Sequence, residues 1–259
     1  MQGILFDLDG VVYQANRAIP GAGEALDWVK SNNIPYLFVT NTTSKPREAI
    51  CSKLAGMGIE ADPQHILTPP AAAVNWLESN VKGTVALFVP EATKTEFSVF
   101  SPWDGDETQA VAAVVIGDLG EAWSFTRLNQ AFRCLIREPA PALIALGMTR
   151  YWRAEDGLRL DTGPFVAALQ YASGVEALVI GKPSAAFFNS GAQRLGVAPE
   201  EILMIGDDIR GDIEGAQQAG LQAALVKTGK FQAQDLQGPV RPNLIMDSIA
   251  ELPAKWQTL

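Results

Sequence analysis

The sequence predicts an α/β protein, in which helices cover a parallel β-sheet and a second, smaller α/β domain is inserted into the first. Apolar segments with the length of buried strands alternate with helical segments near both ends of the chain. The middle of the chain has a strand–helix alternation of its own. Polar residues directly follow several of the apolar segments, which is typical of the ligand-binding edge of an α/β sheet.

The first part of the chain is expected to form strands and helices in strict alternation. Such alternation favours parallel strands, because each parallel neighbour needs a crossover connection. Ser44 as an N-cap, with Pro46 in the first turn, predicts the start of the second helix, and Thr68 predicts the start of the third. The expected strands end at residues 8, 39 and 67, and the expected helices cover residues 22–31, a segment from about 44, and 69–79.

The last part of the chain repeats this alternation, and the middle has its own. In the last part we expect strands over 177–180, 202–205 and 223–226, with helices that end near 195 and 219. In the middle we expect strands over 85–89, 111–116 and 143–146, helices over 126–137 and 165–172, and a hairpin over 151–160 that turns at 155–157. The sequence therefore predicts a core domain made of residues 1–81 and 179–259, with an inserted domain at residues 82–178.

Composition and charge limit the classes of function. The 259 residues carry a net charge of −9, and a protein that binds nucleic acid needs a basic face, so nucleic acid is not an expected partner. Two cysteines, Cys51 and Cys134, form neither a disulfide framework nor a zinc cluster and fit a reducing compartment. The chain shows no signal segment and no apolar stretch that could span a bilayer, so we expect a cytoplasmic protein without a membrane partner.

The most informative segment is the end of the first strand, Asp7-Leu8-Asp9-Gly10. Residues i and i+2 point to the same side of an extended chain, so Asp7 and Asp9 converge on one spot. Burying an unpaired charge is costly, and acids at the end of a buried strand therefore indicate a bound partner. Two clustered carboxylates suit a hard cation such as Mg²⁺. The alternative is a turn that happens to use Asp and Gly.

Polar residues also stand at the ends of three further expected strands. Each set has an ordinary structural explanation: turn formation for Thr40 and Asn41, a surface position for Lys182, and helix capping for the acids. One rule explains all of the sets together, because the carboxyl ends of parallel strands share one edge of the sheet. The candidate site residues at these ends are Asp7, Asp9, Thr40, Asn41, Lys182, Asp207, Asp208 and Asp212.

These residue types together fit phosphoryl transfer. A carboxylate such as Asp7 can act as the nucleophile and form an aspartyl-phosphate. A cation held by Asp7 and Asp207, together with Lys182, can offset the repulsion between the carboxylate and the phosphate. Side chains at Thr40 and Asn41 can bind phosphate oxygens. The sequence thus predicts a phosphoryl-transfer site at this edge of the sheet.

Four motifs, in order along the chain, resemble those of the haloacid dehalogenase-like hydrolase superfamily. They are Asp7-Leu8-Asp9-Gly10-Val11, Val39-Thr40-Asn41, Gly181-Lys182-Pro183, and Gly206-Asp207-Asp208 with Asp212. The insertion between the second and third motifs is similar to the larger α/β cap of that superfamily. Segments 212–220 and 225–231 resemble the subgroup that contains phospholysine phosphohistidine inorganic pyrophosphate phosphatase and its relatives. The resemblance implies a Rossmann-like core domain with an inserted cap domain.

The resemblance also implies catalytic roles. Asp7 is implied as the nucleophile and a metal ligand. Asp9 is implied as the acid that protonates the leaving group and the base that then activates water, while its backbone carbonyl binds the metal. Thr40 and Asn41 are implied to hold phosphate, and Lys182 to stabilise Asp7 and the transferred group.

For the metal, the resemblance implies Mg²⁺ bound directly by Asp207, with Asp208 and Asp212 in support. The expected function is a Mg²⁺-dependent phosphatase whose substrate is a small phosphate monoester, phosphoamide or pyrophosphate. Two alternatives stay open, a phosphomutase or phosphotransferase on the same site and a non-catalytic regulator that binds a phosphorylated ligand. A nicotinamide dehydrogenase is excluded because no G-x-G-x-x-G follows the first strand. The sequence leaves open whether the chain forms a homodimer.

Overall fold

The computed structural model describes residues 1–106, 108–154 and 156–258. The chain divides into two compact units. The first unit comprises Met1–Thr40, Arg47–Thr68 and Lys182–Leu259, and the second unit comprises Asn41–Pro46 and Pro69–Gly181. The predicted domain boundaries near residues 82 and 178 stay a prediction.

Within the described residues, the first unit contains a sheet of six parallel strands in the order β14-β13-β12-β1-β4-β5. The chain first builds outwards from β1 through β4 to β5, and it later returns to the other side of β1 for β12, β13 and β14. The boundary between β1 and β12 is therefore the topological switch point, where open α/β sheets bind ligands. The strands are β1 (Gly3–Asp7), β4 (Tyr36–Val39), β5 (Ile66–Leu67), β12 (Ile202–Gly206), β13 (Gln222–Val226) and β14 (Leu244–Met246).

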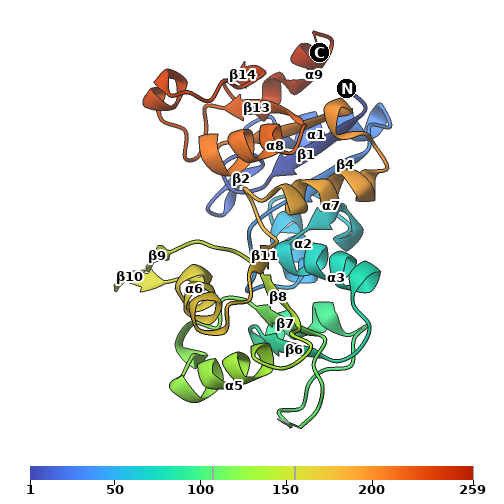
Figure 1. The fold of residues 1–259 in the computed structure, drawn as a ribbon. Helices are drawn as coiled ribbons and strands as arrows, with labels where there is room; N and C mark the ends of the chain where they lie inside the picture. The colour runs from blue at the N-terminus through green and yellow to red at the C-terminus, as the bar shows by residue number, and fades with distance from the viewer. Residues whose placement is uncertain (107, 155, 259) are drawn as a thin grey trace. The chain divides into compact units, whose positions relative to one another are not determined.

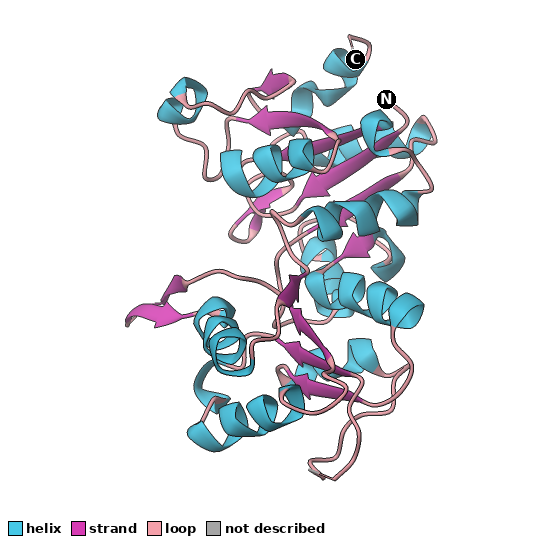
Figure 2. Cartoon of the chain, in the orientation of Figure 1, coloured by secondary structure: helices cyan, strands magenta, loops and turns pink. Residues whose placement is uncertain are grey.

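Helices cover both faces of this sheet (Figure 1, Figure 2). On one face α1 (Ala22–Ser31), α2 (Arg47–Ala55) and α9 (Leu252–Trp256) pack in a cluster with alternate residues of the strands. On the other face α7 (Ala185–Leu195) lies against β1, and it contacts α8 (Gly215–Gln218). Because successive side chains of a strand point to opposite faces, a strand covered on both faces is apolar throughout. This explains the apolar run of residues 3–6 in β1, a strand that is buried at every residue and ends at Asp7.

An aromatic cluster fixes two neighbouring strands, β1 and β4, on one side of the switch point. In the parallel register Ile4 pairs with Tyr36 and Phe6 pairs with Phe38. The ring centroids of Phe6 and Phe38 lie 6.1 Å apart, and those of Tyr36 and Phe38 lie 5.5 Å apart. Burial of a large apolar side chain contributes about 1.5–3 kcal/mol. This packing holds the carboxyl ends of β1 and β4 beside one another.

The second unit has a parallel sheet of its own, in the order β11-β8-β7-β6. Helices α5 and α6 pack on one face of it through a cluster that includes Val114, Ala131 and Val166. The antiparallel strands β9 and β10 form a separate hairpin. The elements are α3 (Pro69–Asn80), β6 (Val85–Phe88), α4 (Glu91–Lys94), β7 (Ala113–Ile116), α5 (Phe125–Leu135), β8 (Ala142–Ala145), β9 (Tyr151–Ala154), β10 (Gly157–Leu160), α6 (Thr162–Ser173) and β11 (Ala177–Val179).

The predicted α/β class and the parallel strands are confirmed, with differences at a few elements. Helix α2 begins at Arg47 rather than near Ser44, because Lys45 precedes a proline and is thereby disfavoured in helical conformation. A small hairpin of β2 (Tyr13–Gln14) and β3 (Arg17–Ala18) was not predicted, since strands this short carry no alternation pattern. The predicted turn of the β9–β10 hairpin includes Glu155, which lies outside the described residues.

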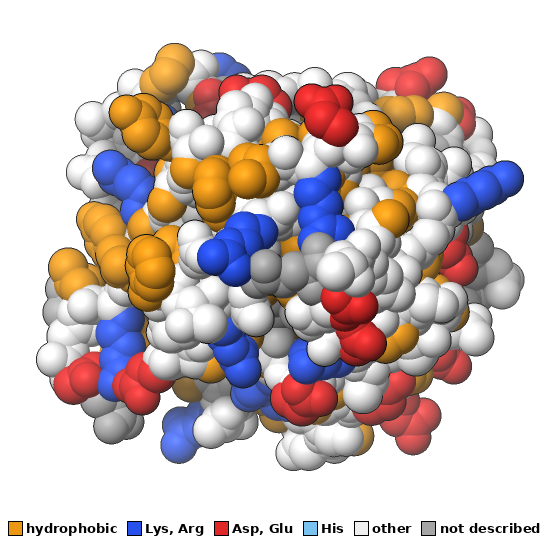
Figure 3. Space-filling view, turned by 60° about the horizontal axis from the view of Figure 1, so that its bottom comes forward, with side chains coloured by type: hydrophobic (Ala, Val, Ile, Leu, Met, Phe, Trp, Pro, Cys, Tyr) orange, Lys and Arg blue, Asp and Glu red, His pale blue; other side chains and the backbone are white. Residues whose placement is uncertain are grey.

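Charges of both signs are spread over the surface. On the face drawn in Figure 3, acidic and basic side chains are interspersed, with hydrophobic side chains between them. Every helix among the described residues falls short of what a membrane span requires in length or apolar character.

The aromatic cluster predicts a large loss of stability on truncation. Phe38→Ala should lower the free energy of unfolding by about 3–5 kcal/mol, because Phe38 is fully buried and its removal leaves a cavity. Phe125→Ala is the matched control, since Phe125 is 83% exposed, and it should change this free energy by no more than about 0.5 kcal/mol. Denaturant unfolding of both variants measures the difference, and equal losses would contradict the packing described above.

Candidate active site at the carboxyl end of the parallel sheet

Two acids lie on either side of the switch point of the first unit. Asp7 is the last residue of β1, and Asp207 directly follows β12, the strand that pairs with β1. The parallel register pairs Phe6 with Ile205, so both carboxylates leave the sheet at the same edge. Asp7 itself pairs with Val39, which places Thr40 at this edge as well.

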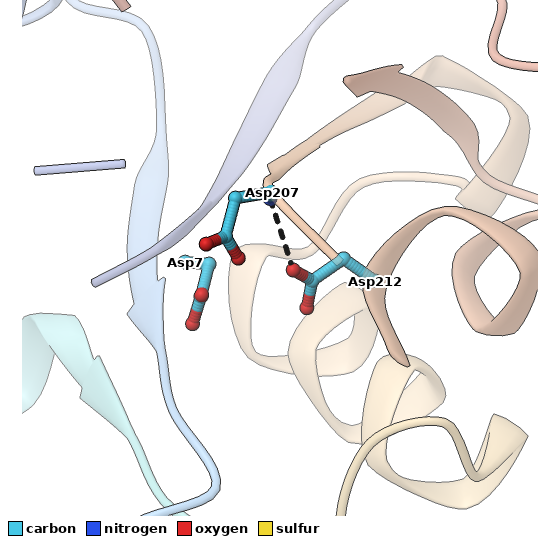
Figure 4. A group of neighbouring side chains, drawn as sticks. All are labelled: Asp7, Asp207 and Asp212. Atoms are coloured by element: carbon cyan, nitrogen blue, oxygen red, sulfur yellow. Dashed lines mark hydrogen bonds between the residues drawn. The ribbon is translucent and has the colours of Figure 1, made fainter. Parts of the chain in front are cut away.

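Three carboxylates meet at this edge, those of Asp7, Asp207 and Asp212. Each offers an oxygen atom, and these oxygens lie within 4.8 Å of one another. All three residues are buried, with exposed fractions of 7%, 1% and 1%. Figure 4 shows the three side chains turned toward one another. An all-oxygen set of this kind is the donor chemistry that hard divalent cations such as Mg²⁺ prefer.

One ammonium group lies among these carboxylates. Nζ of Lys182 is 2.6 Å from Oδ1 of Asp7 and 2.7 Å from Oδ1 of Asp212, and the lysine side chain is only 6% exposed. Burial by itself would lower the pKa of Lys182, but Asp212 and Asp7 outweigh it and raise that pKa above its ordinary value. The ammonium therefore stays charged. Removing one partner of such a buried pair leaves an uncompensated charge in the interior.

The carboxylates outnumber the ammonium group, and their pKa values reflect this. Burial is the main cause that raises the pKa of Asp7, although Lys182 opposes it. Burial also raises the pKa of Asp207 to about 6, against the hydrogen bond from the backbone of Lys230, and the pKa of Asp212 to about 6, against Lys182. A bound cation would stabilise the charged carboxylates and thereby lower these pKa values.

The loop after β12 positions Asp212. The chain forms a π-helical turn, Ile209–Glu214, before α8, where the sequence predicted an ordinary helix start. Through this turn Oδ2 of Asp212 accepts hydrogen bonds from the backbone N–H groups of Asp207 and Asp208, both at 3.2 Å. The close approach needs a glycine, because a Cβ on Gly206 would lie 2.2 Å from Cβ of Asp212.

Asp208 has a different part in the same loop. Its Oδ1 accepts hydrogen bonds from the N–H groups of Arg210 at 3.0 Å and Gly211 at 2.8 Å, which is the geometry of a helix N-cap. Its Oδ2 lies 3.3 Å from Nζ of Lys230. Despite burial, these backbone and lysine contacts hold the pKa of Asp208 below its usual range. Asp208 thus fixes the loop and is not one of the three clustered carboxylates.

The three remaining predicted residues, Thr40, Asp9 and Asn41, differ in burial and in the unit to which they belong. Thr40 is buried in the first unit, where its N–H donates to the carbonyl of Leu67 at 3.2 Å. Asp9 is exposed, and its carboxylate is not part of the clustered set found among the described residues. Asn41 belongs by its contacts to the second unit.

Asn41 lines a cavity of about 280 Å³ inside the second unit. The walls of this cavity also include Trp152 and two carboxylates, Asp118 and Asp161. Burial and, less strongly, Asp161 raise the pKa of Asp118, against the hydrogen bond from Gly120. The remaining wall residues are small, polar or aliphatic: Thr42, Thr43, Ser44, Leu146, Gly147, Thr149 and Thr162.

A wider groove of about 950 Å³ lies elsewhere on the first unit, near the beginning of β4. Tyr36, Cys51 and His65 are among its walls, and His65 stacks on Tyr36 with ring centroids 4.9 Å apart. Among the described residues, the cluster of side chains that could bind a metal ion lies outside this groove. The candidate active site is therefore the carboxylate-rich edge of the sheet rather than this groove.

Two residues contact the carboxylates in ways that the sequence analysis did not predict. Asp212 was expected only to support the metal, whereas the structure brings its carboxylate into the cluster and into contact with Lys182. The N–H of Lys230 donates to Oδ2 of Asp207 at 2.7 Å, and the sequence analysis had noted this segment only as part of a resemblance. A hydrogen bond from a backbone N–H does not depend on the residue type, which explains why the sequence analysis did not predict this contact.

Two family models and several curated proteins match this chain. A family model described as haloacid dehalogenase-like hydrolase matches residues 4–99, and a second model of HAD-hydrolase-like proteins matches residues 179–252. The chain is 37% identical over 256 residues to human phospholysine phosphohistidine inorganic pyrophosphate phosphatase, covering 97% of this chain and 92% of the relative. It is 40% identical over 235 residues to mouse haloacid dehalogenase-like hydrolase domain-containing protein 2, covering 91% and 87%.

Solved structures are similar over almost the whole chain. A hypothetical protein from Pyrococcus horikoshii superimposes with a TM-score of 0.88 at 28% identity, covering 99% of this chain and 100% of that protein. A mutant of the thermostable p-nitrophenylphosphatase from Bacillus stearothermophilus superimposes with a TM-score of 0.83 at 27% identity, covering 96% of both chains.

The raised pKa of Asp207 predicts a pH-dependent stability of the metal-free protein. The folded state binds the proton more tightly than the unfolded state, because the pKa rises from 3.8 to about 6. The free energy of unfolding that protonated Asp207 contributes is fully present below about pH 4 and is lost as the pH rises through about 6. Asp207→Asn stays uncharged, so its thermal midpoint should fall less than that of the unmodified chain between about pH 4.5 and about pH 7.

The exposed acid Asp27 supplies the control for this measurement. Asp27→Asn removes an exposed carboxylate outside the cluster of Asp7, Asp207 and Asp212, so it serves as the matched control variant. Midpoints are compared in buffers that contain a chelator. Identical pH profiles for Asp207→Asn and the unmodified chain would show that the Asp207 carboxyl does not titrate as described.

Proposed function

The chain belongs to the haloacid dehalogenase-like hydrolase family, and we propose that it is a Mg²⁺-dependent phosphatase that forms an aspartyl-phosphate on Asp7. The comparisons support a hydrolase that acts on phosphoryl groups. The proposed substrate is a small phosphate monoester, phosphoamide or pyrophosphate. The observation that carries the proposal is the buried set of Asp7, Asp207 and Asp212 around Lys182 at the switch point of the sheet.

The residues present fit a divalent cation. Three carboxylates face one ammonium group, so the set has an excess of negative charge. Oδ1 of Asp207 is buried and accepts no hydrogen bond from any described residue, which leaves a carboxylate oxygen with an open position. Asp7 and Asp207 would hold Mg²⁺ together with the backbone carbonyl of Asp9, and Asp212 would support them. When bound, Mg²⁺ supplies positive charge that offsets the charge of the phosphate oxygens.

Asp7 has the surroundings of a nucleophile. Its carboxylate attacks phosphorus, a bond forms between the carboxylate oxygen and phosphorus, and the bond from phosphorus to the leaving group breaks. Lys182 lowers the repulsion between the anionic carboxylate and the anionic phosphoryl group, since its ammonium lies 2.6 Å from Oδ1 of Asp7. The buried ion pair also keeps the carboxylate in one orientation before the substrate arrives.

Asp9 is proposed as the general acid and base. It would donate a proton to the leaving group and later take a proton from the water that attacks the phosphorus of the aspartyl-phosphate. That second attack releases inorganic phosphate and restores the Asp7 carboxylate. An exposed carboxyl group two residues beyond Asp7 suits this role. Thr40 and Asn41 are proposed to donate hydrogen bonds to the oxygens of the phosphate.

The inserted domain expected at residues 82–178, which makes up most of the second unit, is proposed as a cap that selects the substrate. Asn41 lines the cavity of the second unit, and in the chain it directly follows Thr40, the residue after β4. Names of relatives support more than one substrate class. One relative is named for phospholysine, phosphohistidine and inorganic pyrophosphate, and one solved structure is a p-nitrophenylphosphatase. The proposed location is cytoplasmic, because the thiols of Cys51 and Cys134, which form no disulfide bond, fit a reducing compartment.

Asp7→Asn tests the proposed nucleophile. The change keeps the shape of the side chain and removes the attacking charge, so phosphate release should fall by at least about three orders of magnitude. Release is measured from a panel of phosphate monoesters, phosphoamides and pyrophosphate, with Mg²⁺ and with a chelator. Asp27→Asn is the matched control on the surface and should keep full activity.

The panel also decides between the proposal and its alternatives. Near-native activity of Asp7→Asn would exclude the covalent intermediate. Absence of phosphate release from every compound by the folded, unmodified chain would refute a phosphatase and favour a mutase or a binding protein.

The proposed metal site predicts stabilisation by Mg²⁺. At a concentration 100-fold above its dissociation constant, a ligand that binds only the folded state adds about 2.7 kcal/mol to the free energy of unfolding. Mg²⁺ should therefore raise the thermal midpoint of the unmodified chain, and a chelator should reverse the shift. Asp207→Ala should lose most of the shift, because it removes a carboxylate from the cluster. A shift of equal size in Asp207→Ala would remove Asp207 from the metal site.

A further inference from the structure

The loop after β13 crosses the sheet edge and reaches the loop after β1. Strand β12 lies between β13 and β1 in the sheet, and Asp207 follows β12. Residues 228–230 follow β13, yet their contacts are with Gly10, which follows β1, and with Asp207. The carboxylate of Asp207 is therefore enclosed between two loops that come from the strands on either side.

Three contacts hold this arrangement together. The hydroxyl of Thr228 donates a short hydrogen bond to the carbonyl of Gly10. The N–H of Lys230 donates to Oδ2 of Asp207 at 2.7 Å. The base of the loop is anchored to the neighbouring strand, because the N–H of Lys227 donates to the carbonyl of Met246 at 2.9 Å.

Two glycines permit the close approach of the loops. Gly229 has a φ of +61°, and a Cβ there would lie 1.9 Å from Oδ2 of Asp207 and 2.5 Å from Cα of Gly10. Gly10 has a φ of +90°, and a Cβ there would lie 2.0 Å from the same oxygen. Real Cβ atoms do not approach other atoms so closely, so any side chain at Gly229 would displace the carboxylate or the loop.

The contacts act on the two oxygens of Asp207 in different ways. Oδ2 is held by the N–H of Lys230 and packed against both glycines. Oδ1 is buried and has no hydrogen-bond partner among the described residues. The hydrogen bond and the packing at Oδ2 restrict rotation of the carboxylate and thereby restrict the direction of Oδ1.

We infer that Thr228, Gly229 and the backbone of Lys230 form a positioning segment that fixes the Asp207 carboxylate and directs its Oδ1 at the divalent cation. This inference rests on the metal site of the proposed function. Partners that orient a metal-binding side chain in this way typically change metal affinity by about 10–100-fold when they are lost. The segment therefore sets the affinity of the site for Mg²⁺ without contributing a side-chain ligand.

Calorimetric titration of the full chain with MgCl₂, after treatment with a chelator, tests the inference. Thr228→Val removes the hydroxyl and keeps the shape, and it should raise the dissociation constant for Mg²⁺ by about tenfold. Gly229→Ala should raise it by about 100-fold, because the added Cβ moves the Asp207 oxygen. Thr228→Ser keeps the hydroxyl and should restore an affinity near that of the unmodified chain.

Lys230→Met is the matched control within the same segment. It keeps the N–H that binds Asp207 and removes only an exposed ammonium, whose ion pair with Asp208 spans 3.3 Å. The dissociation constant should then change by no more than about fivefold, as for other exposed ion pairs. Phosphatase assays add a second readout: Thr228→Val should need more Mg²⁺ for half-maximal activity but reach a similar kcat at saturation.

The outcomes separate this inference from the proposed function. If the unmodified chain binds Mg²⁺ and Thr228→Val and Gly229→Ala bind it equally well, the positioning role is refuted and the proposed function stands. A segment that only stabilises the fold would lower the thermal midpoint of the metal-free variants and leave the dissociation constant unchanged. If the unmodified chain binds no Mg²⁺, both this inference and the metal dependence of the proposed function are refuted.

Discussion

The buried ammonium of Lys182 between the carboxylates of Asp7 and Asp212 is the interaction on which the site depends. Without it, the interior would hold three clustered carboxylates and no positive charge from a side chain among them. Loss of one partner from a buried ion pair typically costs about 3–5 kcal/mol. The ammonium offsets part of the charge of the cluster, and the remaining excess of negative charge fits the divalent cation of the proposed function.

The fold supplies this cluster by ending strands at one edge. Asp7 and Lys182 are 175 positions apart in the sequence, and they meet because the chain returns to the side of β1 that its first strands left open. Apolar packing on both faces fixes the strand ends, as the cluster of Phe6, Tyr36 and Phe38 illustrates. Glycines then allow the loops to approach, since a Cβ at Gly206 would overlap Asp212.

The two units divide the proposed function between them. The first unit holds the carboxylates, the ammonium and Thr40, which are the groups that phosphoryl transfer requires. The second unit holds a cavity lined in part by two carboxylates and Trp152. This lining differs from the lysine and clustered carboxylates that would bind the phosphate and the cation in the first unit. In the proposed function, reaction chemistry and substrate preference would depend on separate packing cores, so that each could change without the other.

The sequence by itself determined the fold class and the core of the site. The pattern Asp7-Leu8-Asp9-Gly10 and the acids after the strand of residues 202–205 are local signals, because strand periodicity and a polar break are visible over a few residues. Tertiary structure alone decided three further points. Asp212 enters the carboxylate cluster through a π-helical turn, Asn41 packs with the second unit, and the N–H of Lys230 binds Asp207. Each of these three points depends on the path of the backbone and on contacts between distant segments. Residue type and spacing do not determine either of them.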